Sequence, residues 1–175
     1  MRFEEDGELW RSRARVVLSP IAAPSILGLF GFCGATFIVA ANLAGWYGSK
    51  TTGDYLFPMA AIFGGVAQFL AAMWSYKARD GLATAMHGMW GSFWMAYGIL
   101  WAMFATKALA PPPGEYFPAL GFWFIMLAAI TWMGAFASFG ENLGLAATLV
   151  SLAAGSSLLA AAYMSGTMWL QHFGG

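Results

Sequence analysis

Residues 117–139 read FPALGFWFIMLAAITWMGAFASF, and this stretch contains no aspartate, glutamate, lysine, arginine or histidine. Four further apolar stretches accompany it, at about 26–47, 55–76, 82–106 and 143–169. Each is about 20 residues or longer, which lets a helix cross a hydrocarbon core of about 30 Å. The five stretches therefore predict five transmembrane helices.

The composition supports a membrane protein, because 60% of the residues are hydrophobic and only 9% are charged. A soluble domain carries about 25% charged residues. In lipid the backbone must satisfy its own hydrogen bonds, which leaves helices or a closed barrel, and the short alternating segments of a barrel are absent. We predict an all-α integral membrane protein, with a cytoplasmic segment at 1–25 and a transmembrane bundle at 26–175. The lipid bilayer is its expected surroundings, and the zero net charge gives no sign of a nucleic-acid partner.

The positive residues predict the orientation, because cytoplasmic loops carry an excess of lysine and arginine. Two lie in the first and third loops, namely Lys50 and Lys107. The other six lie on the opposite side of the predicted bundle: Arg2, Arg11, Arg13, Arg15, Lys77 and Arg79. We therefore expect a cytoplasmic N-terminus in a bacterial-type inner (plasma) membrane, with the loop containing Pro111–Pro113 outside.

The polar residues within the apolar stretches are few and uncharged, so a catalytic or metal site is not expected. Cys33 is the single cysteine, and His87 and His172 fall too far apart to share a metal. We expect no cofactor, no metal and no enzyme activity. Amide, hydroxyl, indole and phenol groups can solvate a small acid weakly, as conduction requires. The predicted substrate path comprises Gln68, Thr36, His87, Ser92, Trp94, Tyr97, Thr148 and Ser151.

Two of these features have a plainer interpretation beside the functional one. His87 is either a core histidine bonded to a neighbouring carbonyl or a titratable group at the inner mouth of a path. Trp90 and Trp94 either pack against other helices and lipid or line the path. The sequence leaves both alternatives open.

Several motifs resemble those of one transporter family. Residues 63–68 read FGGVAQ, residues 76–77 read YK, residues 90–94 read WGSFW, and residues 27–32 read LGLFGF. They resemble the acetate uptake transporter family, also called succinate–acetate permeases. The resemblance covers most of residues 23–172 and is strongest in the second and third predicted helices.

The resemblance implies a hexamer of six-helix protomers, each with its own pore. It also implies a pore constriction at Phe32, Trp90 and Leu149, the last placed only by its spacing from Gly134. The family has tyrosine at the position of Trp90 and an Asn-Pro-Ala-Pro opening where this chain reads Ala23-Pro24-Ser25-Ile26. The chain also ends at His172–Gly175, where the sixth helix of the family would begin, which favours a truncated chain over a five-helix member.

The predicted function is a transporter or channel for acetate and related small monocarboxylates, with succinate as a further substrate. Proton-coupled uptake and simple anion conduction are both compatible with these residues. The alternative is a membrane scaffold or sensor that transports nothing.

Overall fold

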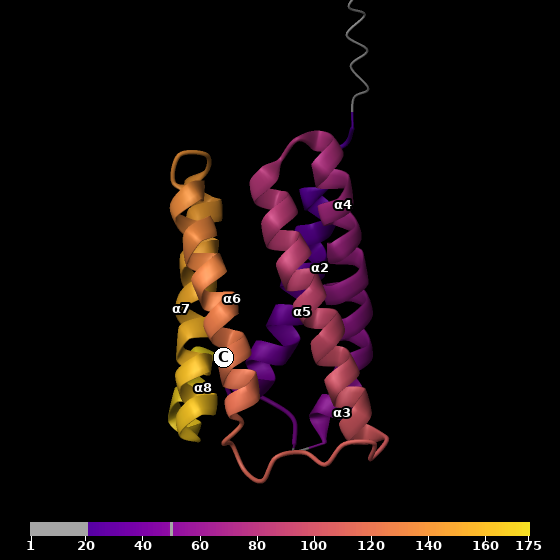
Figure 1. Cartoon of the computed structure of the whole chain (residues 1–175), viewed down its shortest axis with the longest axis vertical. Coiled ribbons are helices and arrows are strands. Elements are labelled where there is room, and N and C mark those ends of the chain that lie inside the picture. Colours follow the sequence, from indigo (N-terminus) through magenta and orange to yellow (C-terminus); the bar gives the residue numbers. More distant parts are fainter. Residues whose placement is uncertain (1–20, 50) are drawn as a thin grey trace, which may run out of the picture.

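The computed structural model describes residues 21–49 and 51–175, so most of the predicted cytoplasmic segment 1–25 lies outside the described residues. Within the described part, the regular structure is helical throughout (Figure 1). The elements are α2 (Ser25–Leu43), α3 (Thr52–Met59), the π-helix η1 (Ala60–Ala67), α4 (Gln68–Ala78), α5 (Gly81–Ala105), α6 (Pro118–Ser138), α7 (Leu143–Ser165) and α8 (Met168–Gly174). The prediction of an all-helical membrane protein is confirmed.

Four helices in the described part are long and apolar enough to span a membrane: α2, the continuous helix Thr52–Ala78, α6 and α7. The third predicted span, α5, has sufficient length at 25 residues but carries more polar and aromatic side chains. Those side chains face other helices, since Thr84, His87, Trp90, Trp94 and Tyr97 are all buried. A helix inside a bundle can be less apolar than one that faces lipid.

The second predicted helix is continuous but changes its geometry in the middle. Pro58 lies inside α3 and has no backbone N–H to donate. The wider π-helical turns of η1 begin two residues later, at Ala60, and continue to Ala67. Gln68 is therefore the first residue after a π-helix, an element that often accompanies functional sites.

Two predicted helix ends were wrong. The fifth helix was expected to reach residue 169, but α7 ends at Ser165 because Gly166 adopts a left-handed conformation with φ +69°. The chain then reverses, and α8 packs back against α7. The first helix ends at Leu43 rather than 47, because Gly45 also turns left-handed, with φ +75°.

Two side chains cap the helices at one end of the bundle. Asp80 caps α5 by accepting a hydrogen bond of 2.8 Å from the Ala83 N–H, as its position before that helix predicted. Asn142 caps α7 in the same way, accepting from the Leu145 N–H at 3.0 Å. These two caps fix the first residues of α5 and α7, so Asp80 and the α6–α7 turn lie at the same end of the bundle as those helix N-termini.

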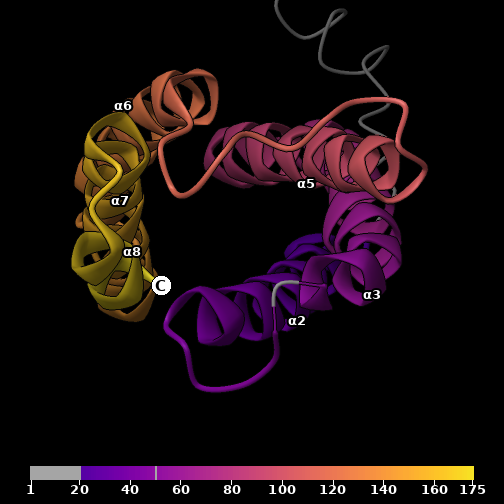
Figure 2. The ribbon, with the colours of Figure 1, turned by 90° about the horizontal axis from the view of Figure 1, so that it is seen from below.

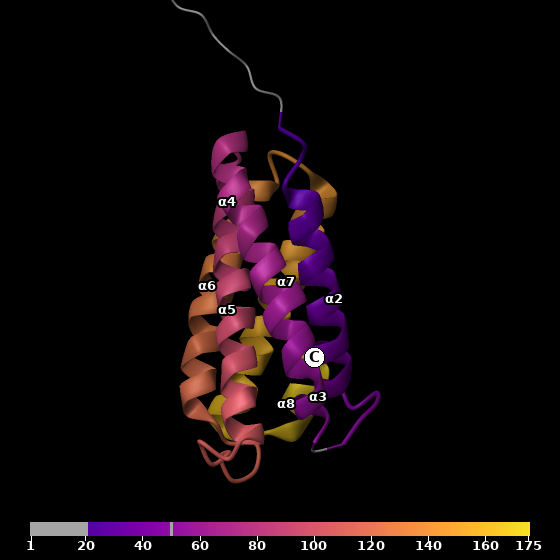
Figure 3. The same cartoon turned by 90° about the vertical axis from the view of Figure 1, so that its right-hand side faces the viewer.

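The helices form two groups that enclose a central space. One group contains α2, the continuous helix from α3 to α4, and α5, and the other is the hairpin of α6 and α7 with α8. The groups meet between α5 and α6 and between α2 and α8, whereas α2 and α7 do not come into direct backbone contact. Viewed along the bundle the helices therefore form an open ring (Figure 2), and the side view shows the same helices running along one long axis (Figure 3).

Candidate functional site

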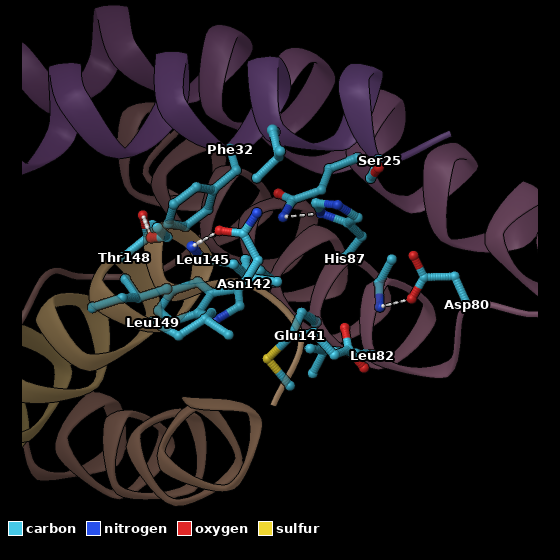
Figure 4. Close-up of a pocket in the computed structure, with 17 residues that line it drawn as sticks. Ser25, Phe32, Asp80, Leu82, His87, Glu141, Asn142, Leu145, Thr148 and Leu149 are labelled. Carbon is cyan, nitrogen blue, oxygen red and sulfur yellow. Dashed lines mark hydrogen bonds between the residues drawn. The ribbon is translucent and has the colours of Figure 1, made fainter. Parts of the chain in front are cut away.

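An upper cavity of about 410 Å³ lies beside the α6–α7 turn. That turn is at the top of the ribbon in Figure 1. Side chains from both helix groups line the cavity, including Ser25 and Phe32 from α2, His87 from α5, and Thr148 and Leu149 from α7 (Figure 4). Its mouth carries the carboxylates of Asp80 and Glu141 and the amide of Asn142. The cavity is thus acidic at its opening and apolar at its base.

Gln68 and His87 form a buried pair on the wall of the upper cavity. Gln68 Nε2 donates to His87 Nδ1 at 3.3 Å, and the two side chains are only 1% and 5% exposed. Gln68 Oε1 is buried with no hydrogen-bond partner. An unpartnered buried amide oxygen is costly, so this atom has unused capacity to accept a hydrogen bond. His87 bonds a side-chain amide, whereas the plainer interpretation had proposed a carbonyl partner.

A lower cavity of about 280 Å³ follows the upper one along the bundle axis. Its polar side chains are all uncharged: Thr36, Trp90, Trp94, Tyr97, Thr148, Ser151, Ser156 and Tyr163. Hydroxyl, phenol and indole groups of this kind can donate hydrogen bonds without fixing a charge. Helices α2 and α7 both line these cavities without close backbone contact, and Thr148 and Ser151 of α7 are exposed.

Four residues line both cavities and therefore mark the boundary between them: Phe32, Trp90, Thr148 and Leu152. The rings of Phe32 and Trp90 meet edge to face with centroids 5.9 Å apart. Trp90 Nε1 donates to Thr131 Oγ1 at 3.2 Å, which ties the indole to α6. Leu149, the third residue expected at the constriction, lines only the upper cavity, and Leu152 lies one turn further along α7.

A third cavity, of about 510 Å³, continues the series to the opposite end of the bundle. It shares Val39, Leu43, Tyr97 and Tyr163 with the lower cavity. Asp54 and Glu115 line it, so this end also carries two carboxylates. The three cavities together form an interrupted path that extends from one end of the described bundle to the other.

The residues at this second boundary were largely missed by sequence reasoning. Only Tyr97 was among the predicted path residues, whereas Val39, Leu43 and Tyr163 were not. Tyr163 is the one aromatic side chain in α7, and that was a usable signal. Nothing local to Val39 or Leu43 distinguishes them from other apolar residues.

The structure brings together seven of the eight predicted path residues. Gln68 and His87 line the upper cavity, Thr36, Trp94, Tyr97 and Ser151 line the lower one, and Thr148 lines both. Ser92 lies elsewhere, because its side chain is exposed on the outer face of α5 and donates to the Gly88 carbonyl at 2.7 Å. Ser92 is two positions from Trp90 and Trp94, and helical neighbours at that spacing point in different directions.

The chain is similar to one solved structure and to two further proteins by sequence. The structure of a bacterial acetate channel, SatP, superposes with a TM-score of 0.78 at 23% sequence identity, covering 89% of this chain and 82% of that one. The meiotically up-regulated gene 86 protein of Schizosaccharomyces pombe is 26% identical over 142 residues, which is 81% of this chain and 46% of that protein. A protein of Methanothermobacter thermautotrophicus is 29% identical over 85 residues, covering 49% of this chain and 40% of its own length.

The chain thus spans less than half the length of these curated relatives. A family model matches almost the whole chain, over residues 6–175. This match confirms the recognition that rested on the motifs of the first three predicted helices. The chain belongs to the GPR1/FUN34/yaaH family.

Proposed function

We propose that this protein conducts acetate and related small monocarboxylates across a membrane. The series of three cavities through the bundle is the observation that carries the proposal. Boundaries made mostly of apolar and aromatic side chains separate the cavities, and the middle cavity is lined by neutral hydrogen-bonding side chains. Conduction needs such weak and successive sites. The fold shared with an acetate channel and the family membership support the same substrate class.

The charges at the two mouths favour small monocarboxylic acids over dicarboxylates such as succinate. Asp80 and Glu141 line one mouth, and Asp54 and Glu115 line the other. Within the described residues, no lysine or arginine lines any of the three cavities. Like charges repel, so a dianion is disfavoured more than a monoanion, and a protonated acid is disfavoured least. We therefore infer that a proton accompanies the acid through the path.

Uptake of labelled acetate into proteoliposomes tests the proposed function. The purified protein should accelerate acetate uptake over empty vesicles, and acidification of the outside should increase the rate. Gln68→Leu removes the buried amide from the upper cavity, and we expect it to reduce uptake while leaving assembly intact. A protein that reconstitutes intact and leaves acetate permeability unchanged at every pH would argue for a scaffold or sensor.

We also propose that the protein acts as a homo-oligomer, a hexamer as the family resemblance implies, in a bacterial-type inner membrane. The open side between α2 and α7 exposes Thr148 and Ser151. A neighbouring copy packed against this side would shield these two side chains from lipid. Cross-linking in native membranes would reveal the oligomeric state.

The proposed orientation places the N-terminus and the Asp80 end of the bundle in the cytoplasm. Ala78 and Ala110 are exposed at opposite ends and suit single-cysteine labelling in a Cys33→Ala background. A membrane-impermeant thiol reagent added outside intact cells should modify Ala110→Cys and spare Ala78→Cys. Labelling of Ala78→Cys alone would reverse the orientation, since the prediction rests on the distribution of lysine and arginine.

A further inference from the structure

The imidazole of His87 is held in place by residues of two neighbouring helices. Gln68, at the start of α4, bonds its Nδ1 at 3.3 Å. Gly28 of α2 leaves room for the ring, because a Cβ there would lie 2.6 Å from His87 Cδ2, Cε1 and Nε2 alike. Equal distances to three ring atoms place the Gly28 backbone over the face of the imidazole. Gly28 therefore does not block the direction in which a hydrogen on Nε2 points, because that direction lies in the plane of the ring.

The bond from Gln68 determines which ring nitrogen of His87 carries the hydrogen. A side-chain amide nitrogen only donates hydrogen bonds, so Nδ1 must accept through its lone pair. A neutral imidazole that accepts at one nitrogen carries its hydrogen on the other. The pair therefore holds His87 as the Nε2–H tautomer, and Nε2 is a hydrogen-bond donor.

His87 Nε2 remains accessible, unlike three other polar atoms of the bundle. Among the described residues, the side-chain atoms closed off without a hydrogen-bond partner are Thr36 Oγ1, Gln68 Oε1 and Trp94 Nε1. His87 Nε2 makes no hydrogen bond within that part of the chain either, yet it is not closed off. His87 lines the upper cavity, where Figure 4 shows its bond to Gln68, and it lines neither the lower nor the third cavity. The Nε2–H donor therefore faces the upper cavity.

Two other donors in the lining of the upper cavity are already committed to the protein. Trp90 Nε1 donates to Thr131 Oγ1 at 3.2 Å, and Thr148 Oγ1 donates to the Gly144 carbonyl at 3.0 Å. A donor that already has an acceptor gains little from a second one, whereas a free donor in a largely buried site gains a full hydrogen bond. His87 thus offers the cavity a donor that Trp90 and Thr148 do not.

We propose that His87 Nε2–H binds the carboxyl group of the transported acid in the upper cavity, with Gln68 as the residue that positions the imidazole. A carboxyl oxygen accepts a hydrogen bond from such a donor. A neutral ring holds a carboxylate less tightly than a lysine or arginine does, so release stays fast, as conduction requires. This subsite rests on the proposed transport function and specifies which atom the acid meets inside the mouth that carries Asp80 and Glu141.

The first experiment observes His87 directly by nuclear magnetic resonance. The chain has two histidines, so His172→Gln leaves His87 as the single one. In that protein, isotopically labelled at the imidazole nitrogens and solubilised in detergent, we expect the signals of the Nε2–H tautomer. Acetate should shift the Nε2 signal until it saturates, whereas chloride at the same ionic strength should not. Adding Gln68→Leu should give a mixture of the two tautomers, because no amide then donates to Nδ1.

The second experiment measures acetate uptake into proteoliposomes over a series of concentrations. His87→Phe keeps an aromatic ring and removes both nitrogens, and it should raise the half-saturating acetate concentration about tenfold. His172→Phe is the matched control, because His172 is exposed on α8 and lines none of the three cavities. The control should stay within about twofold of the wild type.

The outcomes separate the subsite from the transport function. If the wild type transports acetate but acetate leaves the His87 signals unchanged, the subsite is wrong and the transport function stands. A folded His87→Phe protein with the half-saturating concentration of the wild type also overturns the subsite. A saturable shift in a protein that transports nothing would support the subsite and refute transport, and absence of both would refute both. The magnetic resonance experiment leaves His87 unchanged, so it decides the matter if His87→Phe does not fold.

Discussion

Trp90→Ala is expected to widen the boundary between the upper and lower cavities and to admit larger acids. Trp90 lines both cavities and meets Phe32 edge to face, so alanine there removes most of the aromatic barrier on α5. We expect acetate flux to rise and the flux of butyrate or succinate relative to acetate to rise about tenfold, which corresponds to about 1.4 kcal/mol in barrier height.

The measurement is a competition series with labelled acids in proteoliposomes, with Trp123→Ala as the control for loss of a packed indole. Trp90 is 3% exposed, and its replacement also releases Thr131 Oγ1, so a lower stability accompanies the change. Trp90→Phe keeps an aromatic ring and should give an intermediate selectivity. A folded Trp90→Ala protein with unchanged rates for every acid would make Trp90 a packing residue and leave the path without this boundary.

Gly31→Ala is expected to destabilise the bundle by about 1–3 kcal/mol in the free energy of unfolding. A Cβ on Gly31 would lie against the Phe63 carbonyl oxygen, well inside van der Waals contact. That carbonyl belongs to the backbone of η1, so it cannot move aside as a flexible side chain would. Close approach of α2 and η1 is needed because packing, rather than hydrophobic burial, holds membrane helices together.

Thermal unfolding in detergent compares Gly31→Ala with Gly81→Ala, a matched substitution at the start of α5. A Cβ on Gly81 meets nothing within 4 Å, so this control should keep or slightly raise the stability because alanine favours a helix. Equal stability of the two variants would contradict the tight contact between α2 and η1. If Gly31→Ala loses acetate uptake and Gly81→Ala does not, the cause is displacement of Gln68, which lines the upper cavity next to Gly31.

The sequence by itself determined the membrane setting, the positions of the long helices and many of the polar residues that line the cavities. Apolar runs such as 117–139 depend on local composition, and α6 at Pro118–Ser138 falls within one residue of that stretch at each end. Polar residues deep in such runs must face other helices or a cavity, which is why Gln68, Thr36 and His87 were identifiable. The Asp80 cap was also a local signal.

Only the tertiary structure decided which polar groups are satisfied and where the cavities narrow. Trp90 finds its acceptor on Thr131, a residue 41 positions away, whereas Trp94 finds none, although the two indoles are one helical turn apart. Ser92 shares their helix but faces outward, and Leu152 rather than Leu149 lines both cavities. These outcomes depend on which helices face each other and how closely they approach, and the periodicity of one helix does not contain that information.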